Sequence, residues 1–535
     1  MSPETNAGAE KWWTRRWRDA LGLDAGYEAV RWWFLRAMGL GYLAAFFSLA
    51  WQIGALYDAD GLAPVAQYLG QVERFLSDPF TRWMQVPSVF WINSSDAVLN
   101  ALAWTGVVLS LLVTLNLGAR FLLPVLWILY LSFVSVGPPF LNFQWDILLL
   151  EMGFLAALFA LTERPSLLFL WLLRWLCFRL MWLNGVVKIL AVDRDYLDGT
   201  SSTWWEGTAL SYHYFSQPLP AWPAWFFHHL PPWWHTASTY GVLAVELAVP
   251  FLVFLGRRPR LVAAIAFAGL HLLIWVAGSQ AFYNLLGLAL LIPLLDDRVL
   301  AAGRRWLGLD RLARWQPWLP RLGALWGRGL DLGLRGGWFR SKEARMASYS
   351  VQLLVAGILF LLSIFVLNQR LEWFRTPDWM DVVLRDASPY HLVSNYGAFS
   401  NMTRTRPEFV LEGSDDRRNW QEYEFWYKPG APDRAPGWAA PYQPRVDWQM
   451  WFAALGAHSP WLDRVTQAIG RHDPDFLRLL RTNPFPDGPP KYLRLVKYDY
   501  EFTGWEEGWE SGRWWKREQL GRSQVIPLHL LPGEF

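Results

Sequence analysis

The sequence predicts a polytopic α-helical membrane bundle of about nine spans, followed by a soluble, mostly-β sandwich domain with a helical insertion. Two features of the 535-residue chain support this prediction. Of its residues, 53% are hydrophobic, and apolar runs of membrane-spanning length recur over the first two thirds of the chain. The mean hydropathy of +0.12 is too low for a bundle alone, which indicates an additional soluble part.

The membrane part is predicted at residues 31–296, after a polar cytoplasmic segment at 1–30. Two long loops, 58–96 and 193–236, are expected on the outer side, and loops of this length usually serve a function. A last transmembrane helix is expected at 349–370. The apolar runs that define the nine spans lie at about 32–57, 97–117, 120–140, 143–162, 167–192, 237–256, 260–277, 280–296 and 349–367.

Between the bundle and the last helix, residues 297–348 alternate arginine with tryptophan and leucine. This pattern predicts a basic, interfacial amphipathic segment that faces anionic lipid, and the alternative is an ordinary cytoplasmic linker. The composition of residues 380–535 is that of a soluble domain. Within it, three stretches alternate like strands, and two stretches between the second and the third of them have helical patterns. The strand-like stretches are 407–412, 421–427 and 492–502, and the helical ones are 447–455 and 461–469.

The distribution of arginine predicts the orientation. If the N-terminus is cytoplasmic, the inside loops hold Arg120, Arg164, the cluster 257–260 and the basic segment 297–348. This agrees with the positive-inside rule. An odd number of spans then places the C-terminal domain outside, in the lumen or periplasm. The expected location is the endoplasmic reticulum membrane in a eukaryote and the inner membrane in a bacterium.

Composition and motifs exclude several classes of function. The net charge is +3 and no basic stripe carries interleaved aromatic residues, so no nucleic-acid partner is expected. Cys177 is the only cysteine, which excludes an intramolecular disulfide and a cysteine-based metal site. Gly-x-Ser-x-Gly, HExxH and phosphate-loop motifs are absent. We therefore predict no cofactor and no metal site.

The apolar run 167–192 nevertheless carries Arg179, Asn184 and Lys188. Polar and ionisable groups at this depth normally face a protein interior or a wet cavity, so they indicate a polar centre in the bundle. Asn184 and Lys188 are four residues apart and share a helix face. Arg179 lies nine residues before Lys188 and is expected roughly on the opposite side.

Lys188 admits three interpretations: a structural ion pair, part of a polar binding site, or a desolvated amine that acts as a base. The carboxylates available for pairing are Asp146, Glu151 and Glu246. Asp146 is expected near the outer surface, as a helix cap or in a salt bridge. Glu151 is a candidate partner of Arg179.

Aromatic residues mark two further candidate contacts. Tyr212 and His213 lie in an outer loop dense in aromatic residues, where they indicate either a membrane-interface belt or a binding site. Trp448 and Trp451 of the C-terminal domain are expected to be exposed and available to a partner.

Several strings of the chain resemble the lipase maturation factor family over nearly all of the sequence after residue 30. The resemblance implies a polytopic membrane protein whose outward C-terminal domain helps dimeric secreted lipases reach their folded, active state. The strings are residues 143–151, 174–188, 210–220, 395–397, 402–408, 412–414, 423–430, 444–451 and 483–486.

A shorter resemblance concerns Gly185–Ile189, which is similar to a segment of vitamin K-dependent γ-carboxylases. In those membrane enzymes the corresponding lysine is the proposed base toward vitamin K hydroquinone, and by position it matches Lys188. The resemblance implies that a lysine at this place can do chemistry.

Two hypotheses follow. The favoured one is a non-enzymatic, membrane-embedded folding factor for secreted lipases or similar exported proteins, with an exported client protein and membrane lipid as partners. The alternative is a carboxylase-like membrane enzyme that acts on a quinone-like or lipid substrate, with Lys188 as the catalytic base. The candidate binding residues are Arg179, Asn184, Asp146, Glu151, Tyr212, His213, Trp448 and Trp451.

Overall fold

The computed structural model describes residues 18, 22, 25–162, 164–190, 202–306, 342–456 and 459–528. Most of the predicted N-terminal segment and most of the basic interfacial segment lie outside the described residues. The beginning of the second long outer loop, up to residue 201, also lies outside them.

Eight helices within the described ranges are long and apolar enough to cross a membrane, which confirms the polytopic bundle. Their apolar side chains pack on one another or face outward, as expected for helices in lipid. The eight are α2 (Glu28–Tyr57), α5 (Asp96–Thr114), α6 (Ala119–Val136), α7 (Gln144–Leu161), α8 (Leu167–Leu190), α11 with η2 (Pro232–Phe254), α12 (Arg257–Ala277) and α17 (Lys342–Leu371, apolar from Met346).

The ninth predicted span, 280–296, is a short buried helix, α13 (Tyr283–Leu291), extended by η3 (Ile292–Leu294). It still joins the two ends of the bundle. Before it, the Ser279 hydroxyl accepts a hydrogen bond from Ala439 of the C-terminal domain (2.8 Å). After it, Asp297 accepts one from the backbone of Glu28 at the start of α2 (2.9 Å). The C-terminal domain therefore contacts the residues just before this short helix.

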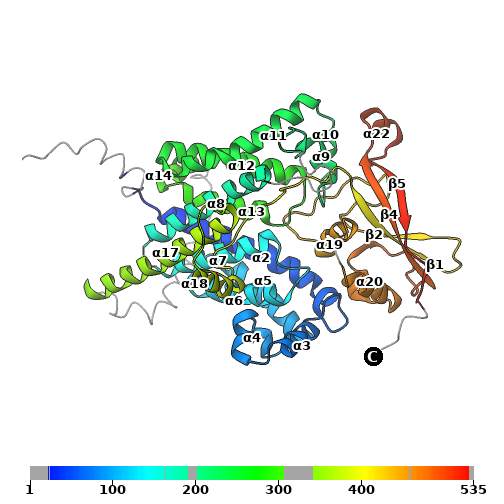
Figure 1. Ribbon diagram of the computed structural model, residues 1–535, viewed down its shortest axis with the longest axis horizontal. Coiled ribbons are helices and arrows are strands. Elements are labelled where there is room, and N and C mark those ends of the chain that lie inside the picture. The colour runs from blue at the N-terminus through cyan, green and yellow to red at the C-terminus, as the bar shows by residue number, and fades with distance from the viewer. Residues whose placement is uncertain are drawn as a thin grey trace, which may run out of the picture.

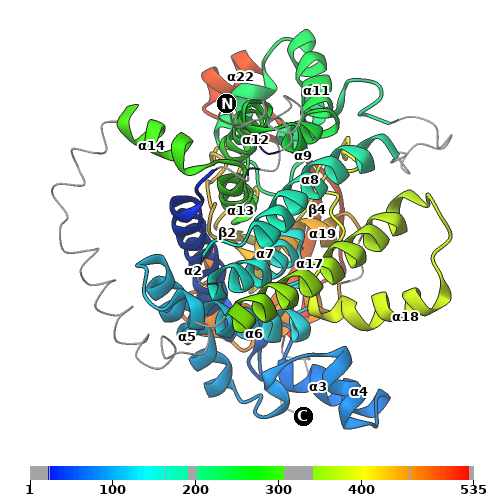
Figure 2. The same cartoon turned by 90° about the vertical axis from the view of Figure 1, so that its left-hand side faces the viewer.

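Short helices fill the connections between the spans. In Figure 2, α3 and α4 lie below the bundle, and α8 and α17 run side by side with α18 beyond them. These connecting elements are α3 (Val65–Phe75), α4 (Pro79–Gln85), η1 (Val89–Trp91), α9 (Ala209–Ser216), α10 (Pro223–His228), α14 (Asp297–Trp306), α18 (Asp378–Ala387) and η6 (Ser388–Tyr390).

The C-terminal domain is built on one antiparallel sheet of six strands, in the order β3-β2-β1-β4-β5, with β6 paired to β4. The longest pairing, between β1 and β4, runs from Pro407 opposite Asp499 to Ser414 opposite Tyr492. The strands are β1 (Pro407–Ser414), β2 (Gln421–Phe425), β3 (Leu480–Thr482), β4 (Tyr492–Phe502), β5 (Trp515–Arg522) and β6 (Ile526–Pro527).

The mostly-β domain with inserted helices is confirmed, but the expected sandwich is reduced to one sheet. Helices take the place of a second sheet because the inner face of this sheet packs on them. Figure 1 shows α19 and α20 between the sheet and the bundle, with the strands at one end of the molecule and α14 at the other. The helices of this domain are α19 (Arg445–Ala454), α20 (Trp461–Gly470), α21 (Pro474–Leu477) and α22 (Trp505–Ser511).

One hydrophobic core continues from the bundle into the C-terminal domain. It includes Phe34 and Leu149 in the bundle, Phe140 between α6 and α7, and Trp461 and Leu493 in the C-terminal domain. The rings of Phe140 and Trp461 lie 5.3 Å apart, edge to face. The two parts therefore share buried apolar surface, which gives their association a hydrophobic contribution.

Candidate functional site

The half of α8 that lies nearer the C-terminal domain carries the buried polar side chains that the sequence singled out. Arg179 is 2% exposed, and Asn184 and Lys188 are each 4% exposed. A charge left without a partner at such a position is costly, so these side chains require partners. The structure takes many of those partners from the segment at residues 392–406, which connects η6 to β1. We call this segment the tether.

Glu151 of α7 and Arg179 of α8 form a buried ion pair that also holds the tether. Glu151 Oε2 accepts hydrogen bonds from the Ser394 backbone N–H (2.9 Å) and the Tyr396 hydroxyl (2.7 Å). Arg179 donates to the Ser394 carbonyl (3.0 Å). Hydrogen bonds to charged groups are the strong ones, so this pair fixes the tether at a defined depth in the bundle.

Asn184, one and a half turns farther along α8, also binds the tether. Its Oδ1 accepts a hydrogen bond from the Ala398 backbone N–H (2.9 Å), and its amide group donates to the Tyr283 hydroxyl (2.9 Å). Between these contacts, Gly397 lies directly on Val187. A Cβ atom at Gly397 would lie 2.9 Å from Val187 Cγ1, so only glycine permits this approach.

Lys188 is paired within the bundle, with Glu246 of α11. Its Nζ lies 2.7 and 2.8 Å from the two carboxylate oxygens of Glu246 and donates to the Asn184 carbonyl (3.2 Å). It also lies 5.1 Å from the ring centre of Trp204, whose Nε1 donates to the tether carbonyl of Phe399 (3.1 Å). Because its amine contacts both carboxylate oxygens of Glu246, Lys188 fits the structural-pair interpretation better than that of a free base.

Tyr212 and His213 of α9 also lie against the tether. The rings of His213 and Phe399 are 5.2 Å apart, edge to face, and the Arg404 guanidinium lies 5.5 Å from the ring centre of Tyr212. Burial, together with the smaller effect of the positive charge of Lys188, lowers the pKa of His213 to about 4, so the imidazole is neutral at neutral pH. Both residues therefore act here as packing surfaces for the tether.

Arg406, at the end of the tether, is fully buried and binds the last turn of α9 and the loop that follows it. Its guanidinium donates to the carbonyls of Phe215 (2.8 Å) and Pro218 (2.7 Å), and to the Glu408 carboxylate (2.9 Å). Lys428 lies 3.3 Å from the second oxygen of Glu408. The planar guanidinium thus donates to two carbonyl groups and a carboxylate at once.

A second buried pair joins the domains where α19 meets the bundle. Asp146 caps the start of α7 by accepting a hydrogen bond from Phe143 N–H (2.9 Å), and it accepts another from the Tyr130 hydroxyl (2.5 Å). Arg445 lies 3.5 Å from the same carboxylate and donates to the Phe140 carbonyl (2.6 Å). Asp146 therefore serves both as a cap and as an interdomain contact.

Trp448 and Trp451 differ from the expected exposed pair. Trp448 is only 4% exposed because its ring packs against Trp145 (4.8 Å) and Phe143 (5.9 Å) at the start of α7. Trp451 is half-buried and packs against Phe452 (5.0 Å). The prediction of an exposed Trp448 is therefore corrected, since that side chain belongs to the core between the domains.

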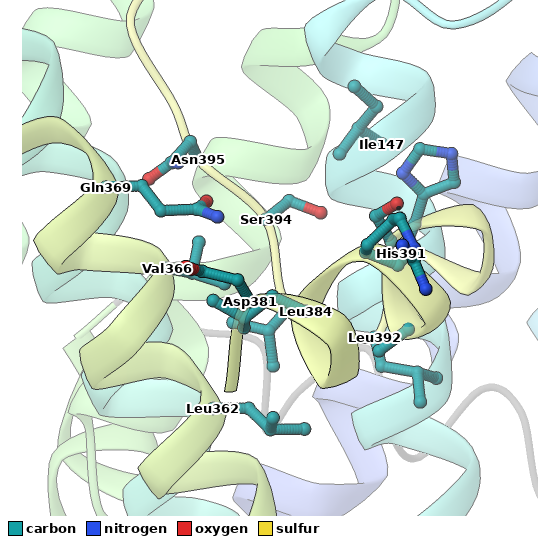
Figure 3. A pocket seen from close by; sticks show the side chains of 14 residues that line it. Ile147, Leu362, Val366, Gln369, Asp381, Leu384, His391, Leu392, Ser394 and Asn395 are labelled. Carbon is teal, nitrogen blue, oxygen red and sulfur yellow. Dashed lines mark hydrogen bonds between the residues drawn. The ribbon is translucent and has the colours of Figure 1, made fainter. Parts of the chain in front are cut away.

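A cavity of about 410 Å³ lies on the other side of the tether. Figure 3 shows Gln369 of α17 and Asn395 of the tether at one side of this cavity, with Ile147 and His391 at the other. Burial lowers the pKa of His391 to about 4, which keeps its ring neutral at neutral pH. The tether thus forms one wall of a mixed polar and apolar space that α17 and α18 complete.

Sequence reasoning found the bundle side of this site but missed the tether side. Ser394 and Tyr396 lie 243 and 245 residues from Glu151, and no periodicity links positions so far apart. Arg406 and Arg445 were also not singled out as site residues. The sequence stretches that resemble the lipase maturation factor family could have pointed to these residues. Three of them, 395–397, 402–408 and 444–451, contain many of the interdomain contacts.

Comparisons with known proteins agree with that resemblance. The family model described as "Lipase maturation factor transmembrane domain" matches residues 29–302, and that described as "Lipase maturation factor C-terminal domain" matches residues 392–525. The second match begins with the tether.

Among curated proteins, lipase maturation factor 2 of Rattus norvegicus is 34% identical, with 91% of this chain and 81% of the relative covered. Lipase maturation factor 1 of Bos taurus is 31% identical, with 94% and 91% covered, and that of Homo sapiens is 30% identical, with 93% and 87% covered. No solved structure matches the chain.

Proposed function

Because this chain belongs to the lipase maturation factor family, we propose that it is a membrane-embedded maturation factor for secreted lipases or similar exported proteins. In this proposal the chain catalyses no covalent reaction. It binds the exported client noncovalently while that client folds. The chain is an integral membrane protein with several spans, which places any such client at the membrane surface.

The observation that carries the proposal is the docking of the C-terminal domain onto the bundle. The tether, Arg406 and Arg445 hold the sheet against one end of the bundle through buried contacts. A rigidly held platform can present a fixed surface to a client, whereas a freely linked domain would lose binding free energy to its own ordering.

We propose that this platform faces the lumen or periplasm. Supporting this, the opposite end of the bundle carries the basic loops, including Arg164 and Arg258, and the ion pair of Arg257 with Asp296 (2.8 Å). Positive charge at that end agrees with a cytoplasmic position. In a eukaryote the membrane would be that of the endoplasmic reticulum, and in a bacterium the inner membrane.

The client surface that we favour contains Trp505 and Trp509 of α22. They are 48% and 65% exposed, and Trp505 stacks on Trp225 of α10 at 5.2 Å. Exposed tryptophans on a rigid support are typical of protein-binding surfaces. This surface replaces Trp448 as the expected contact.

The carboxylase-like alternative is not favoured by the geometry around Lys188. A base must reach a proton of its substrate, and the amine of Lys188 instead contacts both carboxylate oxygens of Glu246. We therefore assign Lys188 to the structure of the bundle and leave the enzymatic hypothesis to a direct measurement.

The test is co-expression with an exported dimeric lipase in cells that lack a maturation factor. The measured quantity is lipase activity per mass of secreted lipase. We expect the wild-type chain to raise it at least several-fold, and the double variant Trp505→Ser/Trp509→Ser to lose most of that gain. The matched control is Trp233→Ser, since Trp233 is 66% exposed on α11.

No gain with the wild-type chain would refute the proposed function for that lipase. A gain that survives in the double variant would refute the proposed client surface only. Protease added to the cytosolic face of sealed vesicles tests the orientation, because cleavage of the C-terminal domain there would reverse the topology.

A further inference from the structure

A second cavity, of about 470 Å³, lies between the outer half of α2 and the C-terminal domain. Aromatic side chains from both parts form its walls. Phe47 and Trp51 come from α2, and Trp426, Tyr427 and Tyr442 come from the C-terminal domain. The two tyrosine rings lie 6.1 Å apart, and the rings of Phe47 and Trp51 are stacked at 6.5 Å.

The cavity also carries one group of each charge. Asp447 is 3% exposed, and its Oδ1 accepts hydrogen bonds from the backbone N–H groups of Tyr427 (2.8 Å) and Lys428 (2.9 Å). Arg478 donates to the Trp51 carbonyl (2.9 Å) and lies 5.9 Å from the Trp51 ring centre. An anion set among aromatic rings and a cation at the rim make the cavity complementary to a zwitterion.

Buried hydrogen bonds fix the width of this cavity. Gln52 of α2 accepts a hydrogen bond from the Arg445 backbone N–H (2.9 Å) and donates to the Gln443 carbonyl (2.7 Å). Gln443 N–H in turn donates to the Ser48 hydroxyl (3.1 Å). The two walls are therefore joined directly beside the cavity, and the site is preorganised before any ligand enters.

The cavity lies next to side chains of a spanning helix that are exposed on the surface of the bundle. Phe47 and Trp51 are 44% and 49% exposed on a spanning helix, and Trp104 of the adjacent α5 is 43% exposed and packs on Phe47 at 6.4 Å. Exposed apolar side chains on spanning helices face lipid, and tryptophan is enriched at the level of the headgroups. The cavity therefore opens beside the place where a phospholipid headgroup lies.

We propose that this cavity binds the headgroup of a zwitterionic phospholipid, one that carries a choline or ethanolamine group. The ammonium lies among Trp426, Tyr427 and Tyr442 with Asp447 as its counter-ion, as aromatic cages bind such cations. The phosphate pairs with Arg478, which is 41% exposed and also contacts Asp475 (2.8 Å). The acyl chains follow Phe47 and Trp51 along α2.

This inference requires only the membrane spans and not a role in maturation, so it fails or stands independently of the proposed function. The probe is binding of defined lipids to the delipidated full chain in detergent, measured by native mass spectrometry. Phosphatidylcholine, phosphatidylethanolamine and phosphatidylglycerol with the same acyl chains are compared. We expect one tightly held molecule of the first two and about five- to tenfold weaker binding of the third.

Variants of Trp426 test the cage itself, because this side chain is 49% exposed and its replacement leaves the fold intact. Trp426→Leu removes the ring and is expected to weaken phosphatidylcholine binding about five- to tenfold, whereas Trp426→Phe retains most of it. Tyr442→Leu and Tyr442→Phe repeat the comparison on the second wall. Trp509→Leu, on α22, is the control and should bind like the wild type.

Equal binding of phosphatidylglycerol and phosphatidylcholine by the wild type would overturn the proposal, and would indicate a site for acyl chains only. Unchanged binding in both leucine variants would overturn it as well. Weakened binding in the leucine variants together with retained binding in the phenylalanine variants supports it.

Discussion

Two buried ion pairs lie on α8, and they serve different parts of the molecule. Arg179 pairs with Glu151 and both of them bind the tether, whereas Lys188 pairs with Glu246 and joins α8 to α11. An arginine presents several donors in a plane, so one guanidinium can hold a carboxylate and a carbonyl together. The lysine donates to Glu246 and to a carbonyl of its own helix. The first pair therefore links two domains, and the second stabilises one of them.

The partners of these residues also bear on whether the polar centre of the bundle binds a ligand or holds the chain together. Glu151, Arg179 and Asn184 all bind backbone groups of the tether. The polar centre is thus a docking site for the C-terminal domain. The following predictions test these pairs and the docked C-terminal domain, in order of expected effect.

Arg179→Met is expected to have the largest effect. It leaves the Glu151 carboxylate buried without its cation, which costs about 3–5 kcal/mol, and it removes the donor to Ser394. The melting temperature of the detergent-solubilised protein should fall, and limited proteolysis should cleave within the tether. The double variant Glu151→Gln/Arg179→Met should recover part of the loss, and a protected tether in Arg179→Met would contradict the docking role.

Lys188→Met should cost less, about 3 kcal/mol, because it leaves Glu246 without its cation but removes no hydrogen bond to the tether. The tether should stay protected from protease, since the Arg179 pair is intact. Lipase activity per mass in the co-expression assay should be close to that with the wild type. Complete loss of that activity in a folded, tether-protected variant would favour the enzymatic alternative.

Gly397→Ala tests the contact of the tether with α8, and Gly185→Ala tests a matched glycine contact inside the bundle. The added Cβ would lie 2.9 Å from Val187, and overpacking of this kind costs about 1–3 kcal/mol. Gly185→Ala, whose Cβ would lie 2.9 Å from Leu247 at the contact of α8 with α11, is the control. Both should lower the melting temperature, but only Gly397→Ala should speed proteolysis of the tether. Equal proteolysis in the two variants would show that the tether contact is not specific.

The smallest expected effect is on how the stability of the C-terminal domain depends on pH. Burial raises the pKa of Asp447 to about 6 from an unfolded value of 3.8, so the folded state binds its proton more tightly. This contribution to stability is fully present below pH 3.8 and is lost as pH rises through 6. Between pH 7 and pH 5 the wild type should gain about 1 kcal/mol relative to Asp447→Asn. An identical pH dependence in both proteins would show that Asp447 is not the titrating group.

The sequence was sufficient for the bundle and for the depth of its polar residues, because apolar length and buried charge are local properties. The sequence did not predict that α13 is too short to count as a span. The apolar run 280–296 does not show that the C-terminal domain contacts Ser279, just before this helix. Trp448 was misplaced for a related reason, because an aromatic residue on a soluble domain packs inward when a second domain covers it. The tether contacts depend on residues more than 200 positions apart, which only the folded chain brings together.

The most direct measurement of the docked tether uses a pair of cysteines at Val187 and Gly397. A Cβ atom at Gly397 would lie 3.4 Å from the Cβ of Val187, close to the separation found in disulfides. In a Cys177→Ala background, Val187→Cys/Gly397→Cys should form a disulfide in native membranes, detected by mass spectrometry of the linked peptides. A control with Val187→Cys/Gly521→Cys should remain reduced. If both thiols of the first pair are instead alkylated freely in the folded protein, the tether does not lie on α8 and the account of a docked C-terminal domain is wrong.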